Sequence, residues 1–247
     1  MYECKHKITY YDLDMVGCVK LSALLKMVHI AADVNASDLG IGFKEMSALN
    51  MTFILQRFAI RVTRMPTYAE TVRIRTWPDG VARGTFTRKG DMYCESGKKI
   101  MEWASLWILF DIEQRRILKP SALPVVIPTF EVHGVEIMPE KISLLPETLG
   151  TEISKHTHTV RYADVDTNMH MNNSIYGDLI GNALFFSESN ATTLSQNWRE
   201  IQINYLSETR LGEEINITTH HKVNEFVITG QTGENPVKSA FAARVLV

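Results

Sequence analysis

Apolar and polar residues follow two different periods along the chain, and each period occurs in both halves. From 21 to 40 the apolar residues recur at helical spacing, whereas between 51 and 112 they alternate with polar residues. Val72 and Ile74, for example, flank Arg73, as expected for a half-buried strand. The pattern of the first half therefore predicts a long helix followed by antiparallel strands.

The same order of elements returns after residue 150. A strand over 156–162 leads into a polar loop, and an apolar segment over 174–187 has the length of a helix. Four further strands are predicted at 199–208, 213–224, 225–232 and 239–247. This order indicates an internal repeat. A helix laid across a curved antiparallel sheet, present twice, is a two-layer arrangement of the α+β class.

Residues 120–150 differ from both halves, because they contain five of the eight prolines of the chain. Proline lacks the N–H group that a central strand needs. We read this segment as a connection between two domains. The prediction is a first domain over 1–125, a proline-rich linker over 126–150 and a second domain over 151–247.

Polar residues crowd into the loop before the second helix, which reads RYADVDTNMHMNNSIY over 161–176. Asp and Asn side chains compete for backbone hydrogen bonds, so this stretch is expected to be a loop, and one of residues 172–174 can cap the helix. Asp166, Asn168 and His170 lie at alternate positions and would point the same way in an extended loop. An acid, a hydrogen-bond donor and a group that titrates near neutral pH would then share one face.

Aligned at an offset of 152 residues, the two halves share the acids of this loop but not its other polar groups. Asp12 and Asp14 fall on Asp164 and Asp166. The positions of Asn168, His170 and Asn172 are occupied in the first half by Val16, Cys18 and Lys20. Only the second half can therefore carry chemistry that needs an acid, an amide and an imidazole together, and the first half is free to hold a substrate.

The loop resembles the active-site segment of the acyl-acyl-carrier-protein (acyl-ACP) thioesterases of plants and bacteria, whose motif runs approximately W-S-D-L-D-x-N-x-H-V-N-N-x-x-Y. Seven residues match in register, with Tyr162 in place of the Trp: Asp164, Asp166, Asn168, His170, Asn172, Asn173 and Tyr176. The first half resembles the same family through Leu55, Arg57, Ile60, Pro66, Glu70, Val72, Ile74, Thr76 and Trp77, and further on through Ser105, Trp107, Asp111, Arg115 and Arg116. The resemblance spans nearly the whole chain, although the central D-x-D-x-N-x-H-x-N-N also occurs in other hotdog-fold thioesterases.

The resemblance implies two tandem hotdog domains of the α+β class, each a long helix wrapped by a curved antiparallel sheet. It places the catalytic residues in the second domain, at Asp166, Asn168, His170 and Glu208. Within the family's Y-R-R-E-C-G segment, Glu208 matches the acid, and Thr209 stands where plant members have Cys. None of the three cysteines lies in the second domain, so the carboxylates are expected to do the work. Asp166 would attack or orient water, Glu208 would activate the water, and Asn168 and His170 would hold the carbonyl oxygen and the attacking group.

The implied activity is hydrolysis of the thioester of fatty acyl-ACP with release of free fatty acid, without a cofactor or a metal. Two alternatives stay open: an acyl-CoA thioesterase of the hotdog superfamily, and a non-catalytic acyl-binding hotdog protein. Asp166 and His170 could begin a metal site, but no third ligand follows at the usual spacing. The preferred chain length is open, and so is the oligomeric state, because a tandem hotdog can stand alone as an internal pseudo-dimer or form a homodimer.

Composition and charge exclude some classes of protein and indicate what kind of partner the chain could bind. The chain has 247 residues, 45% hydrophobic and 22% charged, with a net charge of −2, so it carries no nucleic-acid signature. No apolar run approaches the ~20 residues of a membrane span, and three widely spaced cysteines favour neither disulfides nor zinc, so we expect a cytoplasmic protein.

The charge is not evenly distributed, because residues 51–119 contain 13 Lys and Arg but only 7 Asp and Glu. This excess would suit an acidic carrier protein, with these candidate contacts: Arg73, Arg75, Arg83, Arg88 and Lys89.

Overall fold

The structure is a computed structural model that describes the following residues: 1–130, 132–187, 198–233 and 236–247. They form two compact units, the first from 1–9 and 26–139, the second from 10–25 and 140–247. Residues 10–25 thus belong to the second unit, although they lie in the first half of the sequence. The domain boundaries expected at 125 and 151 stay a prediction.

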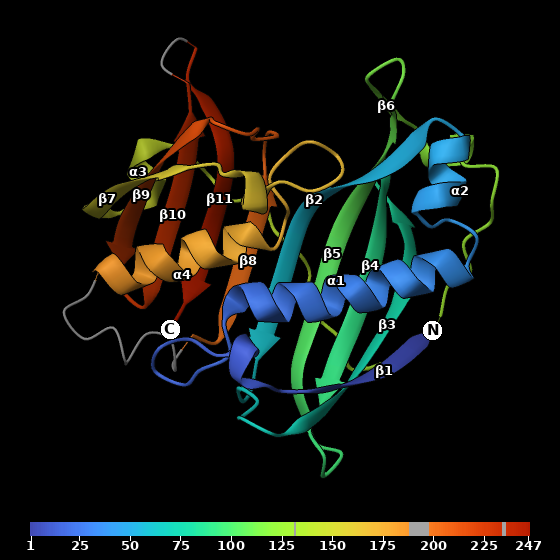
Figure 1. Cartoon of the computed structure of the whole chain (residues 1–247), viewed down its shortest axis with the longest axis horizontal. Coiled ribbons are helices and arrows are strands. Elements are labelled where there is room, and N and C mark those ends of the chain that lie inside the picture. The colour runs from blue at the N-terminus through green and yellow to red at the C-terminus, as the bar shows by residue number, and fades with distance from the viewer. Residues whose placement is uncertain (131, 188–197, 234–235) are drawn as a thin grey trace. The chain divides into compact units, whose positions relative to one another are not determined.

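The first unit is an antiparallel sheet with a long helix along one face (Figure 1). The strand order is β1-β3-β4-β5-β2, and β6 pairs with β5. The elements are β1 (Tyr2–Lys7), α1 (Leu21–Asp38), α2 (Phe43–Ala48), β2 (Met51–Val62), β3 (Thr71–Ala82), β4 (Thr85–Tyr93), β5 (Lys99–Asp111), β6 (Arg116–Leu118) and the 3-10 helix η2 (Pro120–Ala122). The beginning of α1, as far as Leu25, belongs to the second unit.

Side chains of α1 pack on one face of this sheet. The rings of His29 on α1 and Phe58 on β2 meet edge to face, with their centroids 5.7 Å apart. Further along the helix, Asn35 accepts a hydrogen bond from the Nη1 atom of Arg88 on β4 at 2.8 Å. The layer between α1 and the sheet therefore contains polar groups as well as apolar ones.

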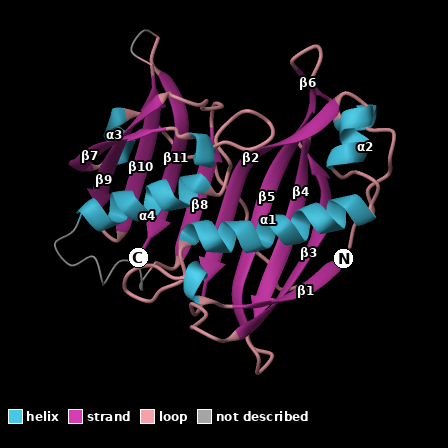
Figure 2. Ribbon diagram, in the orientation of Figure 1, coloured by secondary structure: helices cyan, strands magenta, loops and turns pink. Residues whose placement is uncertain are grey.

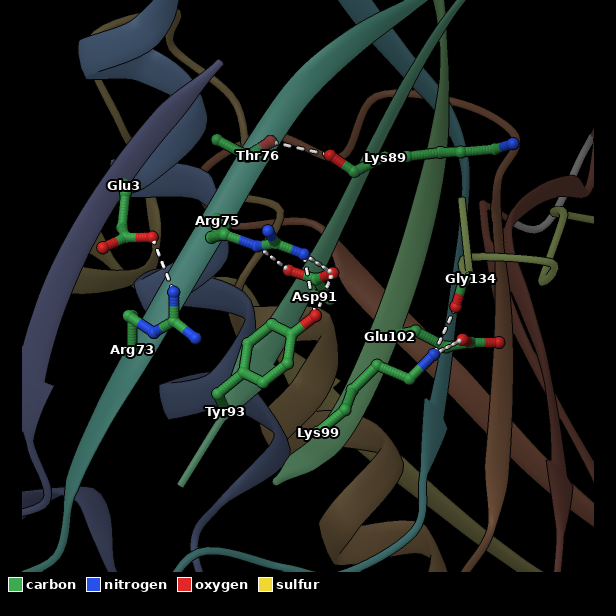
Figure 3. A network of polar contacts seen from close by, with 10 residues as sticks. All are labelled: Glu3, Arg73, Arg75, Thr76, Lys89, Asp91, Tyr93, Lys99, Glu102 and Gly134. Carbon is green, nitrogen blue, oxygen red and sulfur yellow. Dashed lines mark hydrogen bonds and ion pairs between the residues drawn. The ribbon is translucent and has the colours of Figure 1, made fainter. Parts of the chain in front are cut away.

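The opposite face of the first sheet is covered by the chain that follows residue 130. Val135 and Ile137 pack with Trp77 of β3, and all three side chains are buried. Lys99 of β5 donates a hydrogen bond to the C=O group of Gly134, which anchors this segment at the sheet (Figure 3). The proline-rich segment thus completes the core of the first unit, which ends at Pro139.

The second unit repeats the plan with α4 across its sheet (Figure 2). Its strands are antiparallel in the order β8-β11-β10-β9-β7. The elements are η1 (Tyr10–Asp12), α3 (Pro146–Leu149), β7 (Thr151–Thr159), η3 (Tyr162–Asp164), α4 (Ile175–Ser187), β8 (Glu200–Tyr205), β9 (Glu214–Lys222), β10 (Glu225–Thr232) and β11 (Lys238–Leu246).

The beginnings of α1 and α4 meet within the second unit. The Oγ atom of Ser22 donates a hydrogen bond to the carboxylate of Asp178 on α4. A Cβ atom at Gly177 would lie 2.7 Å from the backbone nitrogen of Ser22, so only glycine allows this approach. The two polar loops that precede these helices are therefore carried by the same unit.

Most of the elements predicted from the sequence are confirmed. The helix expected over 21–40 ends at Asp38, and the helix expected over 174–187 is α4. The strand expected from 156 begins earlier, at Thr151, because residues 151–155 pair with β9 without an apolar alternation of their own. The described residues of 120–150 contain no strand, as the prolines indicated. The connection expected from 188 to 197 lies outside the described residues.

Candidate active site

The loop between β7 and α4 folds into a tight turn. The N–H of Asp166 donates to the C=O of His170 at 3.1 Å, and the N–H of Met169 donates to the C=O of Asp166 at 3.0 Å. Val165 and Met171 pair as an antiparallel bridge on either side. Met169 reverses the chain with a φ of 65°. The loop is therefore not extended here, and the turn, rather than alternation along a strand, brings residues 166 and 170 together.

The carboxylate of Asp166 is held by two donors. Oδ1 accepts the backbone N–H of Asn168 at 2.9 Å, and Oδ2 lies 3.4 Å from the side-chain nitrogen of Asn172. Asn172 in turn accepts the N–H and the O–H of Ser174, at 2.9 and 2.8 Å. Because Ser174 directly precedes α4, these bonds fix the half-buried Asp166 carboxylate relative to the start of the helix.

The side chains of Asn168 and His170 are weakly engaged. Asn168 is exposed, and its side chain makes no hydrogen bond to the part of the chain that the structure describes. The Nδ1 atom of His170 lies 3.5 Å from the C=O of Met171, which is longer than a normal hydrogen bond. One turn therefore carries a fixed carboxylate together with an amide and an imidazole that a bound molecule can use.

Glu208 is carried beside this turn by the chain that follows β8. The C=O of Thr209 accepts the N–H of Met171 at 2.8 Å, which joins the two segments. Glu208 itself is an exposed acid, with 43% of its side chain accessible, and it lies 3.6 Å from Arg210. An exposed ion pair of this kind contributes little to stability, so the Glu208 carboxylate is not committed to a structural role.

Thr209 stands where plant members of the family have Cys, and it is fully buried. Its hydroxyl lies 3.1 Å from the hydroxyl of Tyr176 on α4, and the hydroxyl of Tyr205 donates to the C=O of Asn173 at 3.3 Å. Burial raises the pKa of Tyr176, and the hydrogen bond with Thr209 acts in the opposite direction. These contacts hold the segment of Glu208 against the start of α4, and the buried hydroxyl of Thr209 takes part in them.

A second acid–base contact in this loop was not predicted from the sequence. The Nε2 atom of His158 on β7 lies 2.9 Å from Oδ2 of Asp164, and the same oxygen accepts the N–H of Arg161 at 2.9 Å. The C=O of Asp164 accepts the N–H of Asn172 at 2.8 Å. Asp164 therefore ties β7 to both ends of the loop, and a single oxygen of its carboxylate, Oδ2, makes both side-chain contacts.

The first copy of the loop has the same backbone. The N–H of Asp14 donates to Cys18, that of Gly17 to Asp14 and that of Lys20 to Asp12, at 2.8, 3.1 and 2.9 Å. Each bond has its counterpart 152 residues later, and Leu13 and Val19 form the counterpart of the second bridge. The internal repeat predicted from the sequence is thus a repeat of backbone geometry. What differs is the set of side chains that the turn presents.

The described ranges contain neither a cluster of metal-binding side chains nor a membrane-spanning helix. No group of three or more His, Cys, Asp or Glu is placed there to hold a metal ion. No helix among those residues is long and apolar enough to cross a membrane. The expectation of chemistry without a cofactor or a metal stays a prediction.

The cations proposed for carrier recognition are mostly engaged within the first unit. Arg75 meets Asp91 through Nε at 2.7 Å and Nη2 at 2.5 Å, and Nη2 also reaches the hydroxyl of Tyr93 (Figure 3). Arg73 pairs with Glu3 at 3.0 Å. These arginines form a network on the face away from α1, where Asp91 and Glu3 compensate their charge.

The three other cations proposed to contact the carrier protein differ in their exposure and in their partners. Lys89 pairs with Asp79 at 2.9 Å, and Arg83 is exposed at a turn. Arg88 is only 9% exposed and lies on the side of α1. It cannot take part in a surface for a carrier protein, so the expectation that Arg88 contacts the carrier is wrong.

Comparison with known proteins identifies a family that matches both halves of the chain. Family models for the N-terminal and C-terminal domains of acyl-ACP thioesterase match residues 1–121 and 148–241. Dodecanoyl-[acyl-carrier-protein] hydrolase of Cinnamomum camphora is 26% identical over 186 residues, which cover 70% of this chain and 48% of that protein. The hydrolase of the same description from Umbellularia californica is 28% identical, over 68% of this chain and 47% of its own. The chain thus spans about half the length of these relatives.

Solved structures extend the comparison to the fold. The acyl-ACP thioesterase of Bacteroides thetaiotaomicron superimposes with a TM-score of 0.84 over 99% of this chain and 96% of its own, at 23% identity. The 12:0-ACP thioesterase of Umbellularia californica gives a TM-score of 0.80 over the same shares, at 20% identity. These likenesses confirm the predicted α+β fold of two tandem hotdog domains. Since the two family models together match most of the sequence, the chain belongs to the acyl-ACP thioesterase family.

Proposed function

We propose that the protein hydrolyses the thioester of fatty acyl-ACP, releasing free fatty acid and ending chain elongation. The observation that carries the proposal is the turn at 166–170. It holds the Asp166 carboxylate on two donors while the side chains of Asn168 and His170 have no firm partner. Membership of the acyl-ACP thioesterase family supports the carrier protein as the bearer of the acyl group.

Asp166 is proposed as the group that starts the reaction. In one form it accepts a proton from a water molecule, whose oxygen attacks the thioester carbonyl carbon. In the other form its carboxylate attacks directly, and water then hydrolyses the anhydride. In both, the carbon–sulfur bond breaks and the thiolate takes up a proton, so that one water molecule yields one fatty acid and one thiol. The N–H of Asn168 and the Asn172 amide steady the carboxylate throughout.

Asn168 and His170 are proposed to hold the charge that develops on the carbonyl oxygen. An amide N–H and a ring N–H are suitable donors, and neither is committed to another group in the described residues. Glu208 is proposed to activate the hydrolytic water, because its exposed carboxylate is free to accept a proton. The site needs no metal in this scheme, since a thiolate is a fair leaving group.

The acyl-chain pocket is assigned to the first domain as part of this proposal, because the first copy of the loop lacks the amide and the imidazole. A cytoplasmic location belongs to the proposal too and rests on the wide spacing of the three cysteines, which does not favour disulfides. The oligomeric state, monomer or homodimer, follows from the molar mass measured by light scattering.

Thiol release tests the function. Purified protein is mixed with acyl-ACP, with acyl-CoA and with an acyl ester of equal chain length, and free thiol or alcohol is measured. The proposal expects kcat/KM to be higher for acyl-ACP than for acyl-CoA. A reversed order would favour an acyl-CoA thioesterase. Tight acyl binding without any thiol release would favour a non-catalytic acyl-binding protein.

A further inference from the structure

Arg88 places a positive charge in the layer between α1 and the sheet of the first unit. Its Nη1 atom donates to Oδ1 of Asn35 at 2.8 Å and lies 3.3 Å from Oγ1 of Thr76. Both partners are neutral. Among the described residues, no Asp or Glu pairs with this guanidinium, and its Nε and Nη2 atoms make no hydrogen bond. One edge of the guanidinium, at Nη1, thus has partners, whereas Nε and Nη2 on the other edge have none among the described residues.

Arg75 shows how the same sheet satisfies a guanidinium. On the outer face, Arg75 uses Nε and Nη2 together to grip the two oxygens of Asp91 (Figure 3). This is the two-point geometry in which arginine binds carboxylates most strongly. In Arg88 the same two atoms are unused. A carboxylate would fit that edge of Arg88 as Asp91 fits Arg75.

Burial makes the missing counter-charge costly. Arg88 is only 9% exposed, and burial lowers its pKa to about 10, which still leaves it charged at neutral pH. A buried charge without a paired group destabilises a fold, and an apolar side chain of equal size would avoid that cost. The protein retains the charge without compensating it from its own described residues. The unpaired Nε and Nη2 atoms are not among the fully buried polar atoms, so a ligand can reach them.

A second unsatisfied polar atom lies in the same layer. Ser105 is the strand partner of Arg88 and accepts the indole N–H of Trp107 at 2.8 Å. The ring of Trp107 packs 6.4 Å from that of His29, whose buried Nε2 atom has no partner among the described residues. The ring of Phe58 also packs against His29, with the centroids 5.7 Å apart. The surroundings of Arg88 therefore combine aromatic rings with unfilled polar positions.

These contacts select an amphiphilic ligand. Its body must be apolar to lie against Phe58 and Trp107, and one end must carry an anion with two oxygens to match Arg88. We propose that Arg88 binds the carboxylate of a fatty chain, and that the protein accepts acyl thioesters whose far end carries a carboxylate. This rests on the proposed thioester hydrolysis. The same chemistry would come from the carboxylate of a released fatty acid, and the experiment separates the two sources.

The test compares two ten-carbon acyl groups that differ only at the far end. The decanoyl thioester of N-acetylcysteamine ends in a methyl group, and the half-thioester of sebacic acid ends in a carboxylate. For the carboxylate substrate, Arg88→Met should lower kcat/KM by about 10- to 100-fold, mainly through KM, as expected for a lost charged hydrogen bond. The decanoyl thioester should be cleaved as well or better. Arg64→Met, which removes an exposed cation that pairs with Glu70 on the surface, should change neither rate.

A second variant keeps the test independent of how the methionine variant folds. Arg88→Lys retains the charge but not the two-point geometry, so it should lose part of the preference for the carboxylate substrate. Free sebacic and decanoic acids are also added to each protein, and the thermal midpoint is measured. This arm reports binding even if neither thioester is cleaved, in which case the proposed hydrolysis fails separately.

The outcomes divide clearly. A preference for the sebacic half-thioester that disappears in Arg88→Met supports the far end of the substrate as the source. Stabilisation by decanoic acid that depends on Arg88, without that substrate preference, assigns the site to the released product. If wild type and Arg88→Met respond identically to both thioesters and both acids, the proposal is overturned, and Arg88 serves only to join α1 to the sheet.

Discussion

Asp166 differs from an ordinary surface acid because its two oxygens have separate donors, a backbone N–H and a side-chain amide. Both donors lie within the turn, so the carboxylate keeps its orientation without an ion pair. Glu208, in contrast, is exposed and has only a distant arginine. The two acids therefore suit different tasks, one fixed in position and the other able to move with water.

Substitution of these acids should separate catalysis from packing. Asp166→Asn and Glu208→Gln should each lower kcat by at least ~10²-fold, the scale of a lost acid–base group. Thr209→Ala should leave kcat within ~3-fold but lower the free energy of unfolding by about 1–3 kcal/mol, because the Tyr176 hydroxyl loses its buried partner. Steady-state rates and urea unfolding measure both effects. A Thr209→Ala enzyme as inactive as Asp166→Asn would contradict the assignment.

The contact between His158 and Asp164 should act on the reaction through position alone. Neither side chain belongs to the turn at 166–170, but both hold the loop in place. Asp164→Asn and His158→Gln should each lower kcat about 10-fold with little change in KM, since a small displacement of a catalytic group is costly.

A double-mutant cycle measures whether the two side chains work as a pair. The combined variant should be no slower than the single ones, because either change already breaks the contact. His156→Gln is the matched control, since His156 lies on the same strand and its ring nitrogens have no partner among the described residues. Fully additive losses in the cycle would rule out a shared role.

Local patterns and distant contacts differ in how well the sequence reveals them. Asp166, Asn168 and His170 could be proposed from the sequence because residue type and spacing within a few positions suffice for a motif. The contact of Tyr176 with Thr209 joins residues 33 positions apart and needs the folded chain. The count of charges in 51–119 placed Arg88 on the surface, which is wrong. The sequence nevertheless contained evidence against that placement. Arg88 and Lys89 are adjacent on a strand, so only one of them can face outward.

Among the elements, the loop turn is under more backbone strain in the second copy than in the first. Met169 has a φ of 65°, where the first copy has Gly17 at 84°. Left-handed backbone costs a residue with a side chain about 1–2 kcal/mol. Met169 is 73% exposed, so packing gives little in return. Strain of this kind often accompanies a functional turn.

Exchange of these two residues should reveal the strain. Met169→Gly should raise the free energy of unfolding by about 0.5 kcal/mol, after allowing for the greater freedom of glycine in the unfolded chain. Gly17→Ala should lower it by about 1 kcal/mol, although no atom lies within 4 Å of the added carbon. Urea unfolding at constant pH measures both. Stabilisation by Gly17→Ala would show that the turn is not strained.

The long elements were predictable because their patterns are regular, whereas the short ones were not. α1 and α4 show apolar residues at helical spacing, and β3 alternates along its first half. α2 has six residues, with Met46 as its buried member, too few for a period to stand out. The early start of β7 was missed because its side chains are mostly exposed and its register comes from β9.

At the scale of the whole molecule, one backbone design occurs twice with two different sets of side chains. The three backbone hydrogen bonds of each loop correspond at a constant offset, and so does the bridge. In the first copy, Oδ1 of Asp14 accepts the N–H groups of Val16 and Cys18, at 3.0 and 2.9 Å. In the second copy, among the described residues, Asp166 has one backbone donor at 2.9 Å and the side-chain amide of Asn172 at 3.4 Å. The two donors of Asp14 are thus both close backbone groups, whereas one of the two donors of Asp166 is a more distant side chain.

Matched substitutions at the two positions should therefore give opposite results. Asp14→Asn should leave kcat within ~3-fold, because the first copy lacks the amide and the imidazole, whereas Asp166→Asn should lower kcat at least ~10²-fold. Asp14→Ala should lower the free energy of unfolding by about 1–3 kcal/mol, since two N–H groups lose their acceptor. Asp166→Ala should cost less stability than Asp14→Ala. Turnover of the two Asn variants and urea unfolding of the two Ala variants measure these opposite effects on kcat and on stability. Equal losses of turnover from Asp14→Asn and Asp166→Asn would mean that both copies take part in the chemistry, and the division between a holding copy and a reacting copy would have to be abandoned.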